Sequence, residues 1–292
     1  REVDVHQESD PRGRRNRTRF ERLRRENLTP SRHRTMKKSQ LAAQLYTVRA
    51  HTTTATDLAA TFKKVRAIGY PAVQISGVGP IKAEEVARML ADTGLTCCAT
   101  HEGGDAILNE PQRVVERLHA LGCRITAYPY PGGITFDSVD DVKRLAARLN
   151  AAGKVLHDAG CVLLYHNHQI EFRRLGGKTI LERLYEETDP RYLQGEPDTY
   201  WVQFGGGDPV DWCRRLPQRL PVLHLKDYMI MPDSSPLMTE IGNGNLNWHG
   251  IIAAADAAGC QWYCVEQDTC PGDPFDSLRI SYEYLVKTHC AV

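Results

Sequence analysis

Short apolar segments alternate with longer amphipathic segments along most of this chain, and this alternation restricts the fold more than any other feature of the sequence. The apolar segments have the length of β-strands, whereas the amphipathic segments repeat with a helical period. Strands that alternate with helices in this way form a parallel sheet covered by helices. From Met36 onward, the sequence predicts eight strands and eight helices.

The number of predicted elements decides between two architectures. The predicted strands span residues 41–48, 71–75, 96–100, 124–128, 162–166, 195–201, 222–225 and 262–266. The predicted helices span residues 58–67, 83–91, 111–121, 139–159, 179–187, 210–214, 249–257 and 275–287. A doubly wound sheet is the alternative, but no linker divides the chain and no GxGxxG motif follows the first strand. We therefore predict an α/β fold with a single (β/α)8 TIM barrel, which requires about 250 residues.

The charged residues are distributed unevenly between the start of the chain and the rest. Residues 1–35 contain eleven Arg and six acidic residues, a net charge of +5, whereas the remaining chain has a net charge of −4. Clustered Arg could bind RNA, but Phe20 is the only aromatic residue in this segment. A transit peptide is a second alternative, which the six acidic residues disfavour. We predict a disordered extension over residues 1–35 and a catalytic TIM barrel over residues 36–292.

Several classes of protein are disfavoured by what the sequence lacks. No segment approaches the roughly 20 consecutive apolar residues of a membrane span, and no apolar segment follows the basic N-terminus as in a secretory signal. The nine Cys residues include no CxxC pair, so we expect reduced and mostly buried thiols. These features predict a cytoplasmic protein that has no membrane partner.

Polar residues follow four successive predicted strands, where a TIM barrel carries its chemistry. His166 and His168 end the fifth strand, and their spacing of two places both side chains on one face. Asp198, His224 and Glu266 end the next three strands. Each residue alone has an ordinary explanation as a cap, a core histidine or an ion-pair partner. Together they predict a site for one divalent ion, because imidazole and carboxylate ligands suit Mn²⁺, Co²⁺, Fe²⁺, Zn²⁺ and Mg²⁺.

Several motifs in order resemble those of one enzyme family. They are QLYTVR at 44–49, YHNHQIEF at 165–172, DTYWVQFGGGDP at 198–209, HLKD at 224–227, EIGNGNLNW at 240–248 and VEQD at 265–268. The chain resembles the xylose isomerase-like TIM barrels, the sugar phosphate isomerases/epimerases, from residue 36 to about residue 289. It is most similar to the branch with a YHNH strand and also resembles the inosose dehydratases.

The resemblance implies one divalent ion, with Mn²⁺ preferred, held by residues of the last four strands. Asp198, His224 and Glu266 match three family ligands by position. Many members have Glu where this chain has His166 and His168, so either histidine could supply the fourth ligand, and His166 aligns better. The change puts ketose epimerase chemistry in question, because those enzymes use two glutamates as paired bases.

The resemblance also implies the reaction, which removes a proton next to a carbonyl of a keto-sugar or cyclitol through an enediolate. We predict a sugar isomerase or epimerase of carbohydrate metabolism, with a dehydratase (lyase) of an inosose or 3-keto-glycoside as the alternative. Glu266 or Lys226 would be the base and His168 the acid. Lys226 has an equally good explanation as an ion-pair partner of Asp227 or Asp198.

Further polar and aromatic residues lie where a polyol would bind. The candidate substrate-binding residues are Gln44, His101, Tyr128, Glu171, Trp201 and Glu240. A metal nuclease is a rival function, because apurinic endonucleases share the superfamily, but those enzymes need a basic groove for the duplex and this barrel has a net charge of −4. A non-catalytic sugar-binding barrel is the third hypothesis. We therefore expect a small-molecule partner and no nucleic acid, and the sequence leaves a homo-oligomer open.

Overall fold

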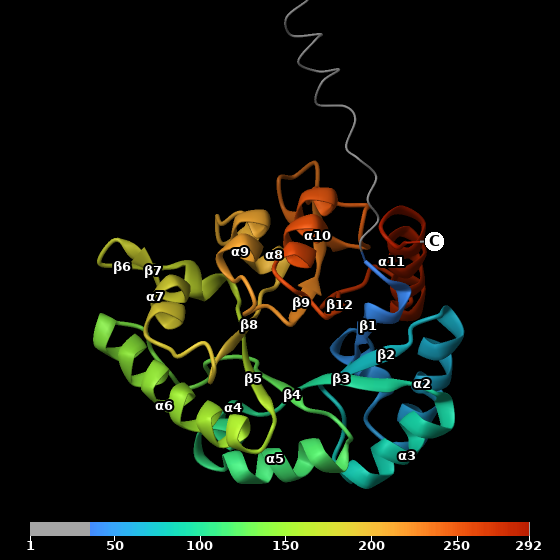
Figure 1. Ribbon diagram of the computed structural model, residues 1–292. Helices are drawn as coiled ribbons and strands as arrows, with labels where there is room; N and C mark the ends of the chain where they lie inside the picture. Colours follow the sequence, from blue (N-terminus) through green and yellow to red (C-terminus); the bar gives the residue numbers. More distant parts are fainter. Residues whose placement is uncertain (1–35, 292) are drawn as a thin grey trace, which may run out of the picture. The chain divides into compact units, whose positions relative to one another are not determined.

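A computed structural model describes residues 36–291, so the predicted extension over residues 1–35 lies outside the described residues. The described part contains eight parallel strands in the spatial order β8-β5-β4-β3-β2-β1-β12-β9 (Figure 1). These strands are β1 (Leu41–Gln44), β2 (Ala72–Ile75), β3 (Thr96–His101), β4 (Ile125–Tyr128), β5 (Val162–His166), β8 (Gln194–Glu196), β9 (Val222–Leu225) and β12 (Trp262–Val265). The sheet closes between β8 and β9, where the amide of His224 donates to the carbonyl of Pro197. The predicted TIM barrel is therefore confirmed.

Helices connect the strands and lie outside them, as Figure 1 shows for α2, α3, α5 and α6. The α-helices are α2 (Ala55–Ile68), α3 (Ala83–Thr93), α4 (Gly104–Asn109), α5 (Pro111–Ala120), α6 (Val139–Asp158), α7 (Ile180–Glu186), α8 (Thr199–Phe204), α9 (Pro209–Arg215), α10 (Trp248–Ala257) and α11 (Pro274–Thr288). Short 3₁₀ helices are η1 (Lys38–Gln40), η2 (Leu45–His51) and η3 (Gln169–Phe172). Two hairpins, β6 (Arg174–Leu175) with β7 (Lys178–Thr179) and β10 (Asp227–Ile230) with β11 (Pro236–Thr239), lie in the loops after β5 and β9.

Local sequence signals place the helix ends. Ser138 caps α6 by accepting a hydrogen bond from the amide of Asp141, whose carboxylate accepts one from the amide of Ser138. After α6 the chain turns through Gly160 at φ 74°, a conformation that residues with a Cβ rarely adopt. The glycines in the helix-to-strand turns before β2, β4 and β12 also have positive φ: Gly69, Gly122 and Gly259.

Two predicted strands end at least four residues earlier in the structure than in the prediction. The first was expected to reach residue 48 but ends at Gln44, whose side chain accepts a hydrogen bond from the amide of Tyr46 and begins η2. The sixth was expected over residues 195–201 but ends at Glu196, because Pro197 has no amide hydrogen for a sheet. Asp198 then caps α8 by accepting from the amide of Trp201. Both corrections fall at the end of the barrel where the candidate site lies.

Apolar side chains pack between the helices and the strands, and a second apolar cluster fills the inside of the barrel. The cluster inside the barrel is built from strand residues with mostly small side chains: Ala42, Ala72, Cys98, Ala99, Ala127, Leu164, Val222 and Cys264. Eight of the nine cysteines are buried, as predicted. No helix of the described residues is long and apolar enough to cross a membrane.

Candidate active site

Buried polar side chains gather at the C-terminal ends of the barrel strands, where the catalytic sites of TIM barrels lie. Those at or near the strand ends are Gln44, Gln74, His166, Glu196 and His224, and the partly buried His101 ends β3 beside them. A cavity of about 530 Å³ opens beside them. Its wall includes His101, His166, His168, Lys226, Glu266 and Asp268. Tyr46 and Tyr130, which are 38% and 50% exposed, also line it and offer aromatic faces to a ligand.

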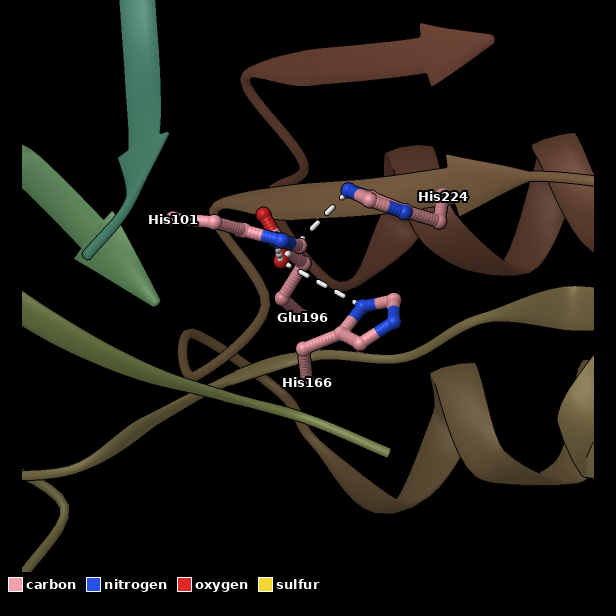
Figure 2. A group of neighbouring side chains, drawn as sticks. All are labelled: His101, His166, Glu196 and His224. Atoms are coloured by element: carbon pink, nitrogen blue, oxygen red, sulfur yellow. Dashed lines mark hydrogen bonds and ion pairs between the residues drawn. The ribbon is translucent and has the colours of Figure 1, made fainter. Parts of the chain in front are cut away.

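Three imidazole rings converge on the carboxylate of Glu196 (Figure 2). The Oε2 atom of Glu196 lies 2.5 Å from Nε2 of His101, 3.4 Å from Nδ1 of His166 and 3.4 Å from Nε2 of His224. The other oxygen, Oε1, accepts a hydrogen bond of 2.6 Å from the side-chain amide of Gln74. Glu196 is completely buried, so its negative charge is balanced by these neighbours rather than by water.

Lys226 is the centre of a second group of charges. Its Nζ atom lies 3.0 Å from Asp198, 2.9 Å from Glu266 and 3.0 Å from Asp268, and its side chain is 1% exposed. Nδ1 of His224 lies 2.9 Å from Oε2 of Glu266 and links the two groups. A buried ammonium is tolerated only because carboxylates partner it, since a buried charge without a partner would be strongly destabilising.

The two groups shift one another's pKa values. Burial alone would lower the pKa of His224, but Glu196 and Glu266 raise it to about 10. Burial would raise the pKa of Glu266, but Lys226 and His224 hold it well below its usual range. Burial raises the pKa of Asp198 to about 6 and lowers that of His168 to about 4. Shifts of this size in a cleft are typical of active sites.

The predicted metal-ligating residues lie close together. Donor atoms of His166, Asp198, His224 and Glu266 all lie within 4.8 Å of one another, a set that we call the two-histidine set. Nδ1 of His166 has no hydrogen bond although the residue is 3% exposed. Buried imidazole and carboxylate donors with an unsatisfied nitrogen fit a divalent ion. His168 begins η3 beyond the strand, and its ring centre lies 5.0 Å from that of His166.

One of the six predicted substrate-binding residues lies in the wall of the cavity. His101 lines the cavity, whereas the other five do not: Gln44, Tyr128, Glu171, Trp201 and Glu240. Glu171 is buried and accepts hydrogen bonds from Tyr165 and from the amide of His168, so it fixes the loop after β5. Glu240 accepts hydrogen bonds from the hydroxyls of Thr239 and Ser277, away from the cavity wall.

The contacts of the remaining three also explain their places. Gln44 caps η2, the Tyr128 ring stacks on that of Tyr165, and the Trp201 ring lies 5.4 Å from the His168 ring. Of the two ion-pair partners expected for Lys226, Asp198 is confirmed. Asp227 is wrong, because its carboxylate accepts hydrogen bonds from the 242–248 loop instead, Trp248 Nε1 among them.

Three residues of these groups were not among the predicted site residues. Glu196 lies two positions before Asp198, so the two-residue period that groups His166 with His168 also groups this pair. Asp268 lies two positions after Glu266 and has the same signal. Gln74, which accepts from Nε2 of His224 at 2.6 Å, is an uncharged residue inside a strand, and nothing in the sequence marks it.

Comparisons with known proteins agree with this geometry. The family model described as "Xylose isomerase-like TIM barrel" matches residues 62–287. An inosose dehydratase from Geobacillus thermodenitrificans is 28% identical over 159 residues, which cover 48% of this chain and 52% of the relative. A second inosose dehydratase, from Lacticaseibacillus casei, is 26% identical over 203 residues, 59% of this chain and 67% of that protein. This chain thus spans about half the length of the first curated relative that it matches.

Solved structures show the same fold. A sugar phosphate isomerase/epimerase from Parabacteroides distasonis superimposes with a TM-score of 0.73 at 24% identity, over 86% of this chain and 94% of that chain. At this identity the likeness concerns the fold. The family model covers far more than half of the residues, and this protein therefore belongs to the xylose isomerase-like TIM barrel family.

Proposed function

We propose that this protein is a divalent-metal-dependent isomerase or epimerase that acts on a keto-sugar or related polyol through an enediolate. The observation that carries the proposal is the buried set of His166, Asp198, His224 and Glu266 beside a cavity large enough for a sugar. When bound there, a divalent ion, preferably Mn²⁺, would polarise the substrate carbonyl and make the neighbouring C–H bond more acidic.

Each protein group has a proposed part in moving the proton. Glu266 lines the cavity and is held in its ionised form, so it is the proposed base. Lys226, 2.9 Å from Glu266, stays charged and would stabilise the oxygen on which negative charge develops. His168 lines the same cavity and burial keeps its ring neutral at pH 7, so it can accept or return a proton from another direction.

A second candidate, a dehydratase of an inosose or 3-keto-glycoside, shares the first proton transfer. Two observations favour it. The curated relatives are named inosose dehydratases, and β5 ends in His166 rather than in the second glutamate that the paired-base mechanism uses. In a dehydratase, the proton relayed through His168 would go to the departing hydroxyl rather than back to carbon.

The test is incubation of the Mn²⁺-loaded protein with ketoses, 3-keto-glycosides and inososes in D₂O. Deuterium in a recovered or isomerised sugar supports the first candidate, and a dehydrated product supports the second. Glu266→Gln should abolish exchange at the α carbon, whereas Glu187→Gln, an exposed control, should not. Cleavage of an abasic duplex without exchange would instead support the nuclease, and sugar binding without turnover would support a non-catalytic barrel.

A further inference from the structure

His101, His166, Glu196 and His224 bring four donor atoms within 4.8 Å of one another, a group that we call the three-histidine set (Figure 2). Two members, His101 and Glu196, have no part in the proposed two-histidine set. The other two are shared. His224 turns Nε2 towards Glu196 and Nδ1 towards Glu266, so its two nitrogens face the two sets.

The spacing of these atoms resembles the coordination sphere of a tetrahedral ion. A Zn²⁺ ion with ligands at about 2.1 Å separates its donor atoms by about 3.4 Å. Oε2 of Glu196 lies 3.4 Å from Nδ1 of His166 and 3.4 Å from Nε2 of His224. The third contact, from Nε2 of His101, is 2.5 Å, so this nitrogen and the Glu196 oxygen would have to move apart to hold an ion.

An unsatisfied nitrogen of His166, which belongs to both sets, fits an ion at this position as well. Nδ1 of His166 makes no hydrogen bond of acceptable geometry, although Oε2 of Glu196 lies 3.4 Å away. The residue is 3% exposed, so water does not easily satisfy the nitrogen. A buried polar atom without a partner is energetically unfavourable. An ion between His166 and Glu196 would remove this deficit.

The charges around the two sets differ. In the two-histidine set, Lys226 already contacts the oxygens of Asp198 and Glu266 at 3.0 and 2.9 Å, so an ion there must displace an ammonium. Among the described residues, only histidines form ion pairs with Glu196. The three-histidine set therefore accepts a cation without displacing a lysine or an arginine.

We propose that the three-histidine set is a second cation position that selects Zn²⁺ and that its occupation excludes an ion from the two-histidine set. Three imidazoles and one carboxylate match the ligand preference of Zn²⁺, whereas Mn²⁺ and Mg²⁺ favour oxygen-rich sites. Exclusion follows because both positions require His166, whereas His224 offers a different nitrogen to each. Zn²⁺ would thus be an inhibitor that traps the protein away from the proposed catalytic arrangement, and this consequence rests on the proposed function.

The experiment measures metal affinity and stoichiometry of the full chain after chelation, with Zn²⁺ and Mn²⁺ as probes. His101→Ala removes a donor of the three-histidine set alone, and Asp198→Asn removes one of the two-histidine set alone. Loss of an outer partner of a ligand already weakens metal binding 10- to 100-fold, so loss of a ligand should weaken it by at least about 100-fold. His101→Ala should lose Zn²⁺ affinity and keep Mn²⁺ affinity, and Asp198→Asn should do the reverse.

Competition tests the exclusion directly. Zn²⁺ should release Mn²⁺ from the wild-type chain one for one. The release is measured by the electron paramagnetic resonance signal of free Mn²⁺. Unchanged Zn²⁺ affinity in both His101→Ala and the isosteric Glu196→Gln would overturn the three-histidine position, while leaving the proposed function intact. Simultaneous binding of both ions would overturn the exclusion. Failure of Mn²⁺ to bind the wild type would instead count against the proposed function, while Zn²⁺ binding that depends on His101 would still support the new position.

Discussion

The buried carboxyl of Glu171 should make the stability of this chain depend on pH in a defined direction. The side chain is completely buried, accepts hydrogen bonds from Tyr165 and from the amide of His168, and has its pKa raised from 4.5 to about 7 by burial. The folded chain therefore retains this proton to higher pH than the unfolded chain. The stability due to the protonated form is present below pH 4.5 and is lost as pH rises through 7.

The magnitude follows from the two pKa values. Linkage gives a loss of about 2.5 kcal/mol between pH 5 and pH 8 for one group with these values. In a domain of this size the loss corresponds to a decrease in Tm of roughly 5–10 °C. Glu171→Gln removes the titration, so its Tm should fall less than that of the wild type over the same range.

Thermal unfolding followed by circular dichroism at pH 5, 6, 7 and 8 measures the difference between the curves. Any constant loss from the altered hydrogen bond to His168 shifts the Glu171→Gln curve without changing its slope. Glu187→Gln, an exposed carboxyl in the same chain, is the matched control and should follow the wild type. Parallel curves for wild type and Glu171→Gln would refute the reasoning.

Three further substitutions test other parts of the structure. Lys226→Met should increase the affinity for Mn²⁺ by about tenfold or more in calorimetric titrations, because the ammonium competes for carboxylate oxygens. Gly153→Ala should lower stability by about 1–3 kcal/mol in denaturant unfolding, because the new Cβ would lie 2.0 Å from the carbonyl oxygen of Tyr192 and this clash outweighs the better helix propensity of Ala. Asp227→Asn should lower the Tm and increase hydrogen exchange in the 242–248 loop, because an NH₂ group would face amide donors.

The sequence predicts the barrel because its signals are local and repeated. Each helix needs an apolar face and each turn needs a residue that accepts positive φ, and Gly160 and Gly259 satisfy this at separate places in the chain. The C-terminal ends of two strands were predicted wrongly, because the apolar pattern continues beyond the point where each strand ends. Pro197 and the cap at Asp198 stop the sixth strand within a segment whose apolar content continues into α8.

The candidate site was predictable only as far as its residues come from strand ends with a repeated polar pattern. His166, Asp198, His224 and Glu266 satisfy that rule and come together. Gln74 does not, because its importance comes from an orientation: one amide bonds Glu196 with its nitrogen and His224 with its oxygen. This role depends on which side chains face one another across the barrel, and that information cannot be obtained from the sequence pattern alone.

The charges of the cavity also bear on the kind of substrate that it can accept. Lys226 is already engaged by three carboxylates, whereas Arg49 donates to the neutral carbonyl oxygens of Tyr46 and Asp268 and keeps its positive charge available. A phosphate would need at least one free cation or a row of amides at a helix N-terminus to offset its charge. Because Glu102, Glu266 and Asp268 also line the wall and would repel a phosphate, we expect an uncharged sugar to bind more readily than a phosphorylated one. The aromatic rings of Tyr46 and Tyr130 suit the apolar faces of such a sugar.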